Sequence, residues 1–191
     1  MSCSFKEKAG KYIDFLNANA YDKERDVRTN IAGEFQKSNL AAALQTAELI
    51  CGRLDEDKIY EALSQIRISG RMEEIAPGII VDVSHNIQGM QGFVQTVEAN
   101  YHGMKKRILF AASHQNEEEY MKNILKTIPE IEAFYTVGIH KRRIDEAEFQ
   151  DAFRKMIDRN QETTVCFVVG SFYLAGMAKE FINQEEENVR L

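Results

Sequence analysis

The chain has 191 residues, of which 44% are apolar and 28% charged, and a formal net charge of −6 from 24 basic and 30 acidic side chains. This composition is typical of a folded globular protein with one large domain, or one domain and a smaller lobe. The acidic balance argues against a general nucleic-acid or anionic-membrane binder, which needs a large positive surface. The basic runs 105–107 and 141–143 could still hold one small anion.

Cysteine usage and the amino terminus indicate a reducing compartment. Cys3, Cys51 and Cys166 are widely spaced and form no Cys-x-x-Cys pair, so we expect neither a zinc site nor a disulfide framework. Cys166 lies in an apolar run, as a small core residue would. The first residues lack the apolar stretch of a signal peptide, and no segment has the length of a membrane span. We therefore expect a cytoplasmic protein.

The first third of the sequence predicts helices separated by polar stretches. Apolar residues recur at helical spacing over 5–16, and the polar stretch 17–30 is expected to be a loop with at most one short strand. A second helix is expected over 35–50. A shorter helix is expected over 56–66, with Asp55 as its N-cap.

After residue 69 short apolar strands alternate with amphipathic helices. Strands are expected over 78–82, 107–112, 131–137 and 163–169, and helices over 90–97, 149–156 and 174–181. This alternation indicates a Rossmann-like α/β domain over 69–191, in which a mostly parallel sheet is covered by helices on both faces. Residues 1–68 form an N-terminal helical segment.

Ligands of such sheets bind beyond the carboxyl ends of the strands. Four strand ends are therefore the places to search: Asp82, Ala112, Gly138 and Gly170. Asp82 could accept two ribose hydroxyls or cap the next helix, and the residues alone leave these roles about even. His85 could coordinate, move a proton or orient a neighbour, although a lone histidine in a turn is more often structural. Asn86 and Ser171 are better explained as caps, although the helix start at Ser171 could hold an anion.

Two common arrangements, a hydrolase triad and a P-loop, are excluded, and a third is disfavoured. Asp82, His85 and Ser171 are the residue types of a hydrolase triad, but Ser171 does not lie in the Gly-x-Ser-x-Gly turn that exposes such a nucleophile. The one Gly-Lys pair, at 10–11, follows Phe5 where a P-loop needs glycine, so no loop can hold a triphosphate with its magnesium ion. An unrelated Rossmann-like enzyme that acts on a nucleotide is a weaker option, because the sequence lacks the Gly-x-Gly-x-x-Gly fingerprint.

Four stretches, in order, resemble the carboxyl-terminal part of the Mur ligase superfamily, and within it folylpolyglutamate synthase. GEFQKSNLAAAL (33–44) resembles the family's Gly-x-His-Gln-x-x-Asn-x-x-x-Ala-Leu helix start, and SGRMEEI (69–75) resembles its Gly-Arg-Φ-Glu entry to the last domain. IIVDVSHN (79–86) resembles Asp-Gly-Ala-His-Asn-Pro behind a strand. VVGSFYLAG (168–176) resembles the Gly-Ser-Leu-Tyr-Leu-like segment before the last helix.

The resemblance implies an enzyme that uses ATP and Mg²⁺ to make an acyl phosphate on a carboxylate, which the amino group of glutamate attacks to form an amide. It implies that Asn39 contacts adenine, Asp82 the ribose hydroxyls and Arg71 the transferring phosphate. A guanidinium suits the last task because its fork of donors meets phosphate charge directly. The resemblance also places His85, Ser171 and Tyr173 on the glutamate side of the cleft. The catalytic residues that it implies are Arg71 and His85.

The sequence departs from the family pattern within these motifs. Val83, Ser84 and Ile87 replace the glycine, alanine and proline of the family turn, and Phe35 replaces a histidine. A β-branched valine would be strained if the turn needs positive φ, which puts close approach of a ligand in doubt.

The family's amino-terminal ATPase domain has no counterpart in these 191 residues. The resemblance implies that the helical segment 1–68 is the end of the ligase's central domain. We therefore carry two interpretations. In the first, the chain is a C-terminal ligase domain that binds adenine nucleotide and glutamate and is inactive alone. It would be a fragment, an expressed domain, or half of a split enzyme that works with a separate ATPase half, and it could form a homodimer. Alternatively, it is a non-catalytic binding or regulatory module derived from such a ligase. No metal site is expected in the chain itself, and the acceptor (folate, dihydropteroate or a cell-wall precursor) stays open.

Overall fold

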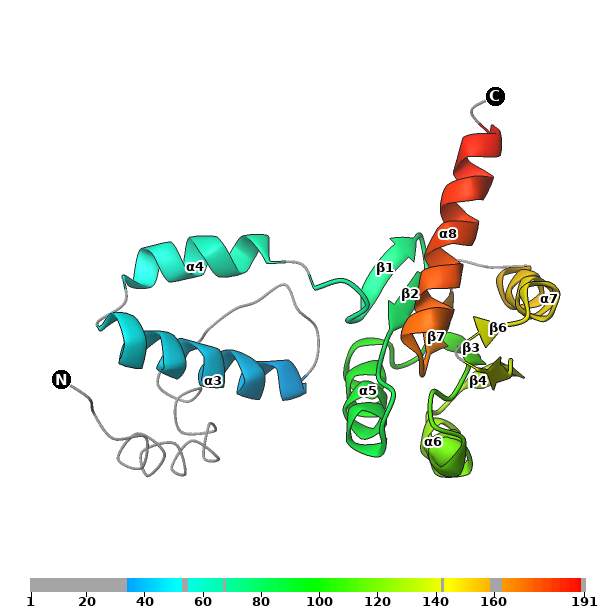
Figure 1. Cartoon of the computed structure of the whole chain (residues 1–191), viewed down its shortest axis with the longest axis horizontal. Coiled ribbons are helices and arrows are strands. Elements are labelled where there is room, and N and C mark those ends of the chain that lie inside the picture. Colours follow the sequence, from blue (N-terminus) through cyan, green and yellow to red (C-terminus); the bar gives the residue numbers. More distant parts are fainter. Residues whose placement is uncertain (1–33, 53–54, 67, 142, 159–162, 190–191) are drawn as a thin grey trace. The chain divides into compact units, whose positions relative to one another are not determined.

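The chain divides into two compact units, Met1–Arg67 and Ile68–Leu191 (Figure 1). The computed structural model describes residues 34–52, 55–66, 68–141, 143–158 and 163–189. The predicted helix over 5–16 and the predicted loop over 17–30 lie outside the described residues.

Two helices make up the described part of the first unit, α3 (Glu34–Cys51) and α4 (Glu56–Gln65). Asp55 caps α4 as predicted, because its side chain accepts a hydrogen bond from the Lys58 amide at 3.3 Å. Leu44 is buried, whereas Ile50 at the end of α3 is 77% exposed. The apolar face of α3 is therefore open at its carboxyl end.

The second unit is an α/β domain, as predicted. Its elements are β1 (Glu73–Ala76), β2 (Ile79–Asp82), α5 (Ile87–Asn100), β3 (Lys105–Phe110), η2 (Gln115–Glu117), α6 (Glu118–Leu125), β4 (Ile131–Thr136), β5 (Ile139–His140), β6 (Arg143–Ile144), α7 (Glu146–Ile157), β7 (Thr164–Val169) and α8 (Phe172–Val189). Every predicted strand and helix of this unit is present. The sequence patterns did not predict β1, α6 or the β5–β6 hairpin.

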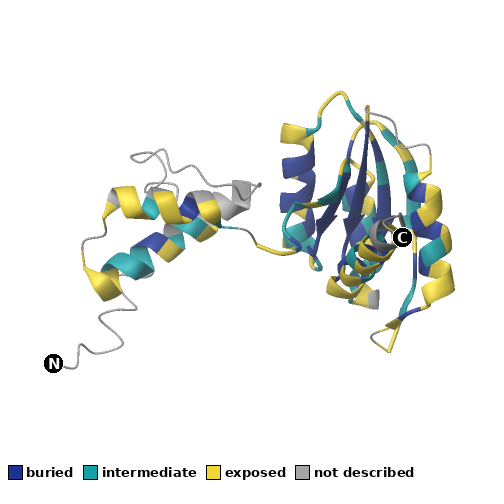
Figure 2. Cartoon of the chain, turned by 90° about the horizontal axis from the view of Figure 1, so that it is seen from above, coloured by how far each residue is buried: buried dark blue, intermediate teal, exposed yellow. Residues whose placement is uncertain are grey.

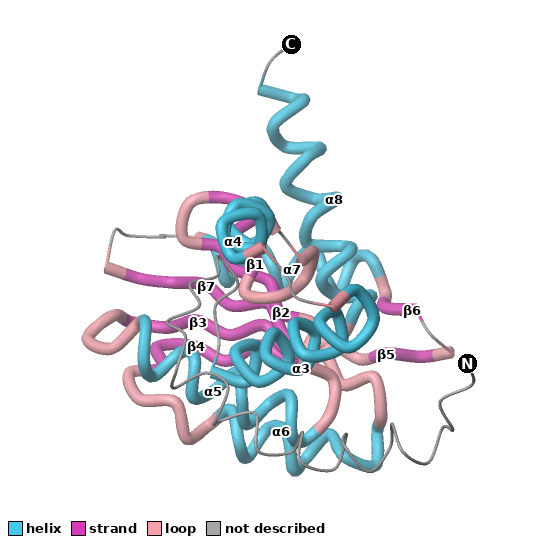
Figure 3. The backbone as a smooth tube through the Cα atoms, turned by 90° about the vertical axis from the view of Figure 1, so that its left-hand side faces the viewer, coloured by secondary structure: helices cyan, strands magenta, loops and turns pink. Residues whose placement is uncertain are grey.

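The main sheet has the strand order β1-β2-β7-β3-β4. Strands β2, β7, β3 and β4 run parallel, and β1 pairs antiparallel with β2, so the predicted mostly parallel sheet is confirmed. Pro77 and Gly78 turn the chain from β1 to β2, and the φ of 72° at Gly78 is what the third position of a type II turn requires. The β5–β6 hairpin is a separate small sheet (Figure 3).

Helices cover both faces of the main sheet, and Figure 2 shows the buried strands between them. On one face α7 and α8 bring Phe149, Phe153 and Phe181 together, with ring centroids 5.1–6.2 Å apart. On the other face α5 and α6 pack over the sheet, where Phe93 meets Phe167 edge-on at 5.5 Å. Every residue of β7 is buried, because the strand lies centrally with helices on both sides.

The strand register brings the carboxyl ends of the parallel strands to one level. Asp82 of β2 pairs with Val169 of β7, which pairs with Phe110 of β3, which in turn pairs with Thr136 of β4. The residues that follow these strands therefore share one edge of the sheet, called here the carboxyl edge. It is the edge where ligands of such folds bind.

Candidate functional site

Asp82 is the centre of a backbone network at the carboxyl edge. Its side chain is 1% exposed, and its two oxygens accept hydrogen bonds from the Ser84 amide at 2.8 Å and the Met72 amide at 3.0 Å. The alternative that Asp82 caps the next helix is wrong, because Asn86 caps α5 by accepting from the Gly89 amide at 2.7 Å. The capping role expected of Asn86 is confirmed.

The segment Ser69–Met72, called here the arginine turn, lies against this network. The Val83 amide donates to the Gly70 carbonyl at 2.8 Å. Gly70 has a φ of 73° and Met72 a φ of 44°, a conformation uncommon for a residue other than glycine. A Cβ at Gly70 would lie 2.6 Å from a Val83 methyl, so only glycine fits there. Arg71 is half-buried, and among the described residues no hydrogen bond or ion pair engages its guanidinium.

Val83, which departs from the family pattern, does not strain the turn. It is not among the residues with positive φ, and its side chain is 3% exposed in the core beside Leu109 and Val168. The condition for strain at this β-branched residue, a positive φ, is therefore not met. Ser84 is 1% exposed, and its hydroxyl has no hydrogen-bond partner among the described residues. The two replacements thus give the turn one core contact and one unsatisfied hydroxyl.

Three side chains, called here the clamp, hold the outer side of the arginine turn. The ammonium of Lys179 on α8 donates to Glu73 Oε2 and to Ser69 Oγ, both at 2.5 Å, and the Gly70 amide donates to the same Glu73 oxygen at 2.5 Å. Burial alone would raise the pKa of Glu73, but the hydrogen bonds from Lys179 and Gly70 outweigh it, so this pKa lies below its usual 4.5. Lys179 was not predicted as a site residue, because it is 106 residues from Glu73 and belongs to no local motif.

His85 lies between β2 and the start of α8. Its Nδ1 is 2.9 Å from the Val83 carbonyl oxygen, which can only accept, so Nδ1 carries the proton and Nε2 is the acceptor of the neutral ring. The ring centroid is 5.5 Å from that of Phe172, a side chain 59% exposed. Phe172 was not predicted as a site residue, although it lies inside the fourth family-like motif.

The start of α8 is packed tightly against the end of β3. Ser171 accepts a hydrogen bond from the Tyr173 amide at 3.0 Å, which confirms its role as a cap. Gly170 has a φ of 108°, and a Cβ there would lie 2.5 Å from the Ala111 carbonyl oxygen. Tyr173 is 43% exposed, whereas Ser171 is 1% exposed. That these two residues face glutamate stays a prediction.

The carboxyl edge thus brings together most of the predicted site residues. These are Arg71, Asp82, His85, Ser171 and Tyr173. Asn39 is exposed on α3 of the first unit, so its contact with adenine stays a prediction. Within the described ranges no group of His, Cys, Asp or Glu side chains is placed to hold a metal ion, and no helix is long and apolar enough to cross a membrane.

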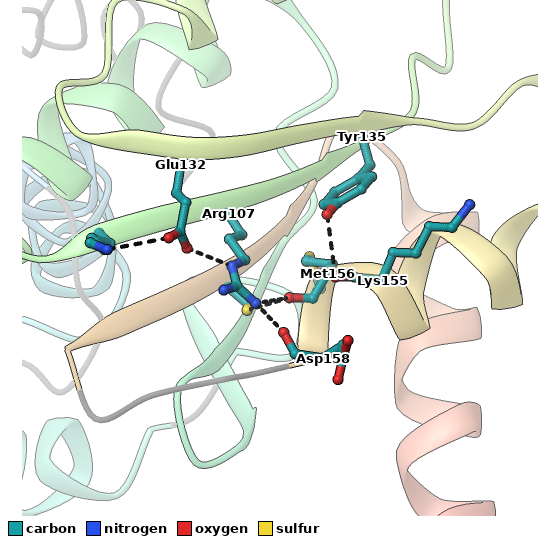
Figure 4. Close-up of polar contacts among 8 residues, drawn as sticks. Arg107, Glu132, Tyr135, Lys155, Met156 and Asp158 are labelled. Atoms are coloured by element: carbon teal, nitrogen blue, oxygen red, sulfur yellow. Dashed lines mark hydrogen bonds and ion pairs between the residues drawn. The ribbon is translucent and has the colours of Figure 1, made fainter.

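The basic run 105–107 lies at the opposite edge of the sheet. Each of its side chains pairs with a carboxylate: Lys105 with Glu132 at 3.3 Å, Lys106 with Glu130 at 2.8 Å, and Arg107 with Glu132 at 2.8 Å. Arg107 also donates to the main-chain oxygens of Met156, at 3.0 Å, and Asp158 (Figure 4). Arg107 therefore ties β3 to the end of α7, and the run links parts of the fold rather than offering free charge to an anion.

Among the described residues, Cys51 is an exposed thiol and Cys166 a buried one, and neither forms a disulfide there. The Cys166 thiol donates to the Met156 carbonyl at 3.4 Å. Burial raises the pKa of the Cys166 thiol to about 11, so it stays protonated and unreactive. Its expected place in the core is confirmed.

Known proteins similar to this chain are folate-related and pseudomurein ligases. No family model matches the sequence. A dihydrofolate synthase/folylpolyglutamate synthase of Bacillus subtilis is 23% identical over 109 residues, which are 54% of this chain and 25% of that protein. The chain therefore spans about a quarter of that relative.

Three solved structures match with similar quality. The apo form of Lactobacillus casei folylpolyglutamate synthase is 19% identical, with a TM-score of 0.65 over 81% of this chain and 38% of the other. Escherichia coli FolC with DHPP and ADP is 18% identical, with a TM-score of 0.66 over 78% of this chain and 39% of the other. A type C pseudomurein peptide ligase of Methanothermus fervidus is 19% identical, with a TM-score of 0.64 over 83% of this chain and 37% of the other.

At these identities the solved structures establish the fold, and the chain covers well under half of each relative. The sequence motifs, the curated relative and the solved structures agree with one another. The chain resembles the Mur ligase superfamily, and its second unit has the α/β fold of the C-terminal domain of a folylpolyglutamate synthase.

Proposed function

We propose that this chain forms the nucleotide-facing and glutamate-facing part of an ATP-dependent carboxylate–amine ligase of the folylpolyglutamate synthase type. The ATPase part would be supplied by a separate chain or by another part of a longer chain. One observation carries the proposal. The arginine turn, whose guanidinium no described residue engages, is fastened beside Asp82 at the carboxyl edge. This is the edge where open α/β sheets bind ligands.

The proposed reaction joins glutamate to a carboxylate that ATP has activated as an acyl phosphate. The glutamate nitrogen bonds to the acyl carbon, the bond from that carbon to the phosphate oxygen breaks, phosphate leaves, and the nitrogen gives up a proton. Arg71 would neutralise charge on the transferring phosphate. His85 would receive the amine proton at Nε2, since Nδ1 already donates to a carbonyl.

Nucleotide use is supported by the relatives. One folylpolyglutamate synthase structure is a complex with AMPPCP and folate, and one FolC structure contains ADP. Asp82 suits a ribose because each carboxylate oxygen accepts one amide hydrogen and keeps a further lone pair. We place the protein in the cytoplasm, where the thiols of Cys51 and Cys166 would stay reduced.

A second candidate is a binding or regulatory module without catalysis. It is favoured by the burial of Asp82, which is 1% exposed and already joins two backbone amides. Asp82 could therefore remain for structural reasons after ligand binding was lost.

Calorimetric titration of the purified chain with ATP, ADP and glutamate separates the candidates. We expect weak, saturable binding of adenine nucleotide. Arg71→Ala should weaken it about tenfold or more, because a hydrogen bond to a charged group contributes about 1.5–3 kcal/mol. Asp82→Ala should also weaken it.

Lys155→Ala is the matched control, since the Lys155 side chain pairs with Asp151 on the exposed side of α7, away from the carboxyl edge. The substitution leaves the main-chain carbonyl that accepts from Tyr135 in place. No binding of any of the three ligands would favour the second candidate. Unchanged affinity in Arg71→Ala would contradict the phosphate contact. Ligase turnover by these 191 residues alone would contradict the need for a further ATPase part.

A further inference from the structure

The arginine turn is held in a conformation that it would not adopt alone. Met72 has a φ of 44°, and a left-handed conformation costs a residue with a Cβ about 1–2 kcal/mol. Such residues persist only where the surrounding structure fixes them, and they cluster at ligand sites. On the inner side, Asp82 and Val83 provide two hydrogen bonds to the turn. These bonds hold Gly70 and Met72 against the end of β2.

The outer side of the turn depends on one side chain from a distant helix. Lys179 bonds to Ser69, the first residue of the turn, and to Glu73, the residue that follows the turn. The same Glu73 oxygen also accepts from the Gly70 amide. Its neighbour Ala178 is fully buried, so α8 is fixed in the core at this point. Through Lys179, the packing of α8 therefore limits how far the turn can move.

The alternative is that Lys179 and Glu73 form an ordinary surface ion pair, which contributes about 0–1 kcal/mol to the stability of the fold. The exposure of the clamp argues against it, since Lys179 is 27% and Glu73 33% exposed, against 61% and 65% for the Lys155–Asp151 pair on α7. The hydrogen bonding also differs. Glu73 accepts from a backbone amide besides Lys179, whereas the α7 pair joins two side chains one helical turn apart.

We propose that Lys179 is a positioning residue for Arg71. By clamping Glu73 and Ser69 it holds the arginine turn in one conformation and so fixes the point from which the guanidinium reaches the nucleotide phosphate. This rests on the proposed function, in which Arg71 contacts that phosphate. Lys179 itself touches no ligand.

The first test is ATP affinity measured by calorimetry in the full chain. Lys179→Met keeps most of the aliphatic stem but removes the charge and the three donors. We expect about a tenfold loss of affinity, since small misplacement of an otherwise intact group has effects of this order or larger. Lys179→Arg should restore most of the loss, and Lys155→Met, the matched control, should change nothing. Full affinity in Lys179→Met would overturn the proposal.

A double-mutant cycle separates positioning from general damage. If Lys179 acts through Arg71, then Lys179→Met should cause no further loss of ATP affinity once Arg71→Ala is present. Each single substitution would then lower ATP affinity. The double variant would lose no more affinity than Arg71→Ala by itself. Independent, additive losses would overturn the proposal.

Hydrogen exchange of the ligand-free chain tests the clamp without any nucleotide. Lys179→Met should speed exchange at the Gly70 and Met72 amides, which the turn protects, and leave β7 unchanged. Exchange that stays slow at both amides would overturn the clamp. If the wild-type chain binds no nucleotide but the exchange result holds, the proposed function fails and the role of Lys179 in the turn stands.

Discussion

At the scale of single residues, Asp82 and Ser84 are both buried and polar, but they differ in whether their side chains are hydrogen-bonded. Both side chains are 1% exposed. Asp82 has an amide donor for each of its oxygens, whereas the Ser84 hydroxyl has no partner among the described residues. A buried polar group stabilises the fold only where it is hydrogen-bonded, so the two residues should respond differently to substitution.

Asp82→Asn should destabilise the ligand-free chain by about 1–3 kcal/mol. An amide has one acceptor oxygen, so its NH₂ group would face the amide hydrogen of either Ser84 or Met72. Urea unfolding followed by circular dichroism measures the difference. An unchanged midpoint would mean that the network around Asp82 does not stabilise the fold.

Ser84→Ala is the matched change at the same strand end. It removes a hydroxyl that lacks a partner, so stability should be unchanged or rise by up to about 1 kcal/mol. A clear loss of stability in Ser84→Ala would show that the hydroxyl is bonded in solution, for example to a buried water molecule.

At the scale of elements, the junction between β7 and α8 depends on a single glycine. Gly170 has a φ of 108°, and an added Cβ would lie 2.5 Å from the Ala111 carbonyl and 2.7 Å from the Phe110 ring. Phe110 is the last residue of β3 and Ala111 follows it, and both are buried, so neither can shift without disturbing the core. Gly170→Ala should therefore destabilise the chain by about 2–4 kcal/mol.

The same helix offers a glycine without these constraints. Gly176 is exposed in α8, and an added Cβ meets nothing within 4 Å. Gly176→Ala should stabilise the chain by about 0.5–1 kcal/mol, since alanine loses less backbone entropy in a helix. Thermal unfolding of Gly170→Ala and Gly176→Ala measures both changes in stability. Equal changes of the same sign would contradict this account of the junction.

The strength of the local pattern decided which elements the sequence predicts. Strands β2 and β7 are buried at every residue, which requires the continuous apolar runs that identified them. Strand β1 has the sequence EEIA and lies at the sheet edge, so its pattern is not apolar, although Pro77-Gly78 is a turn signal that could have revealed it. The clamp was beyond prediction, because Glu73 and Lys179 meet only through the tertiary fold.

At the scale of the whole molecule, the family-like motifs fall in both compact units. The stretch 33–44 belongs to the first unit, and the stretches 69–75, 79–86 and 168–176 belong to the second. The structural matches cover about four-fifths of the chain. That the first unit is the end of a ligase central domain stays a prediction, whereas the fold of the second unit can be tested directly.

A chain that begins at Ile68 should fold without the first unit. Both core clusters of the α/β domain are built from residues between Met72 and Ile182, and helices of the same unit cover both faces of its sheet. Starting at Ile68 also keeps Ser69 for the clamp. The urea midpoint of residues 68–191 should therefore equal that of the corresponding transition in the full chain, with a single cooperative transition. A lower midpoint would show that the first unit stabilises the second.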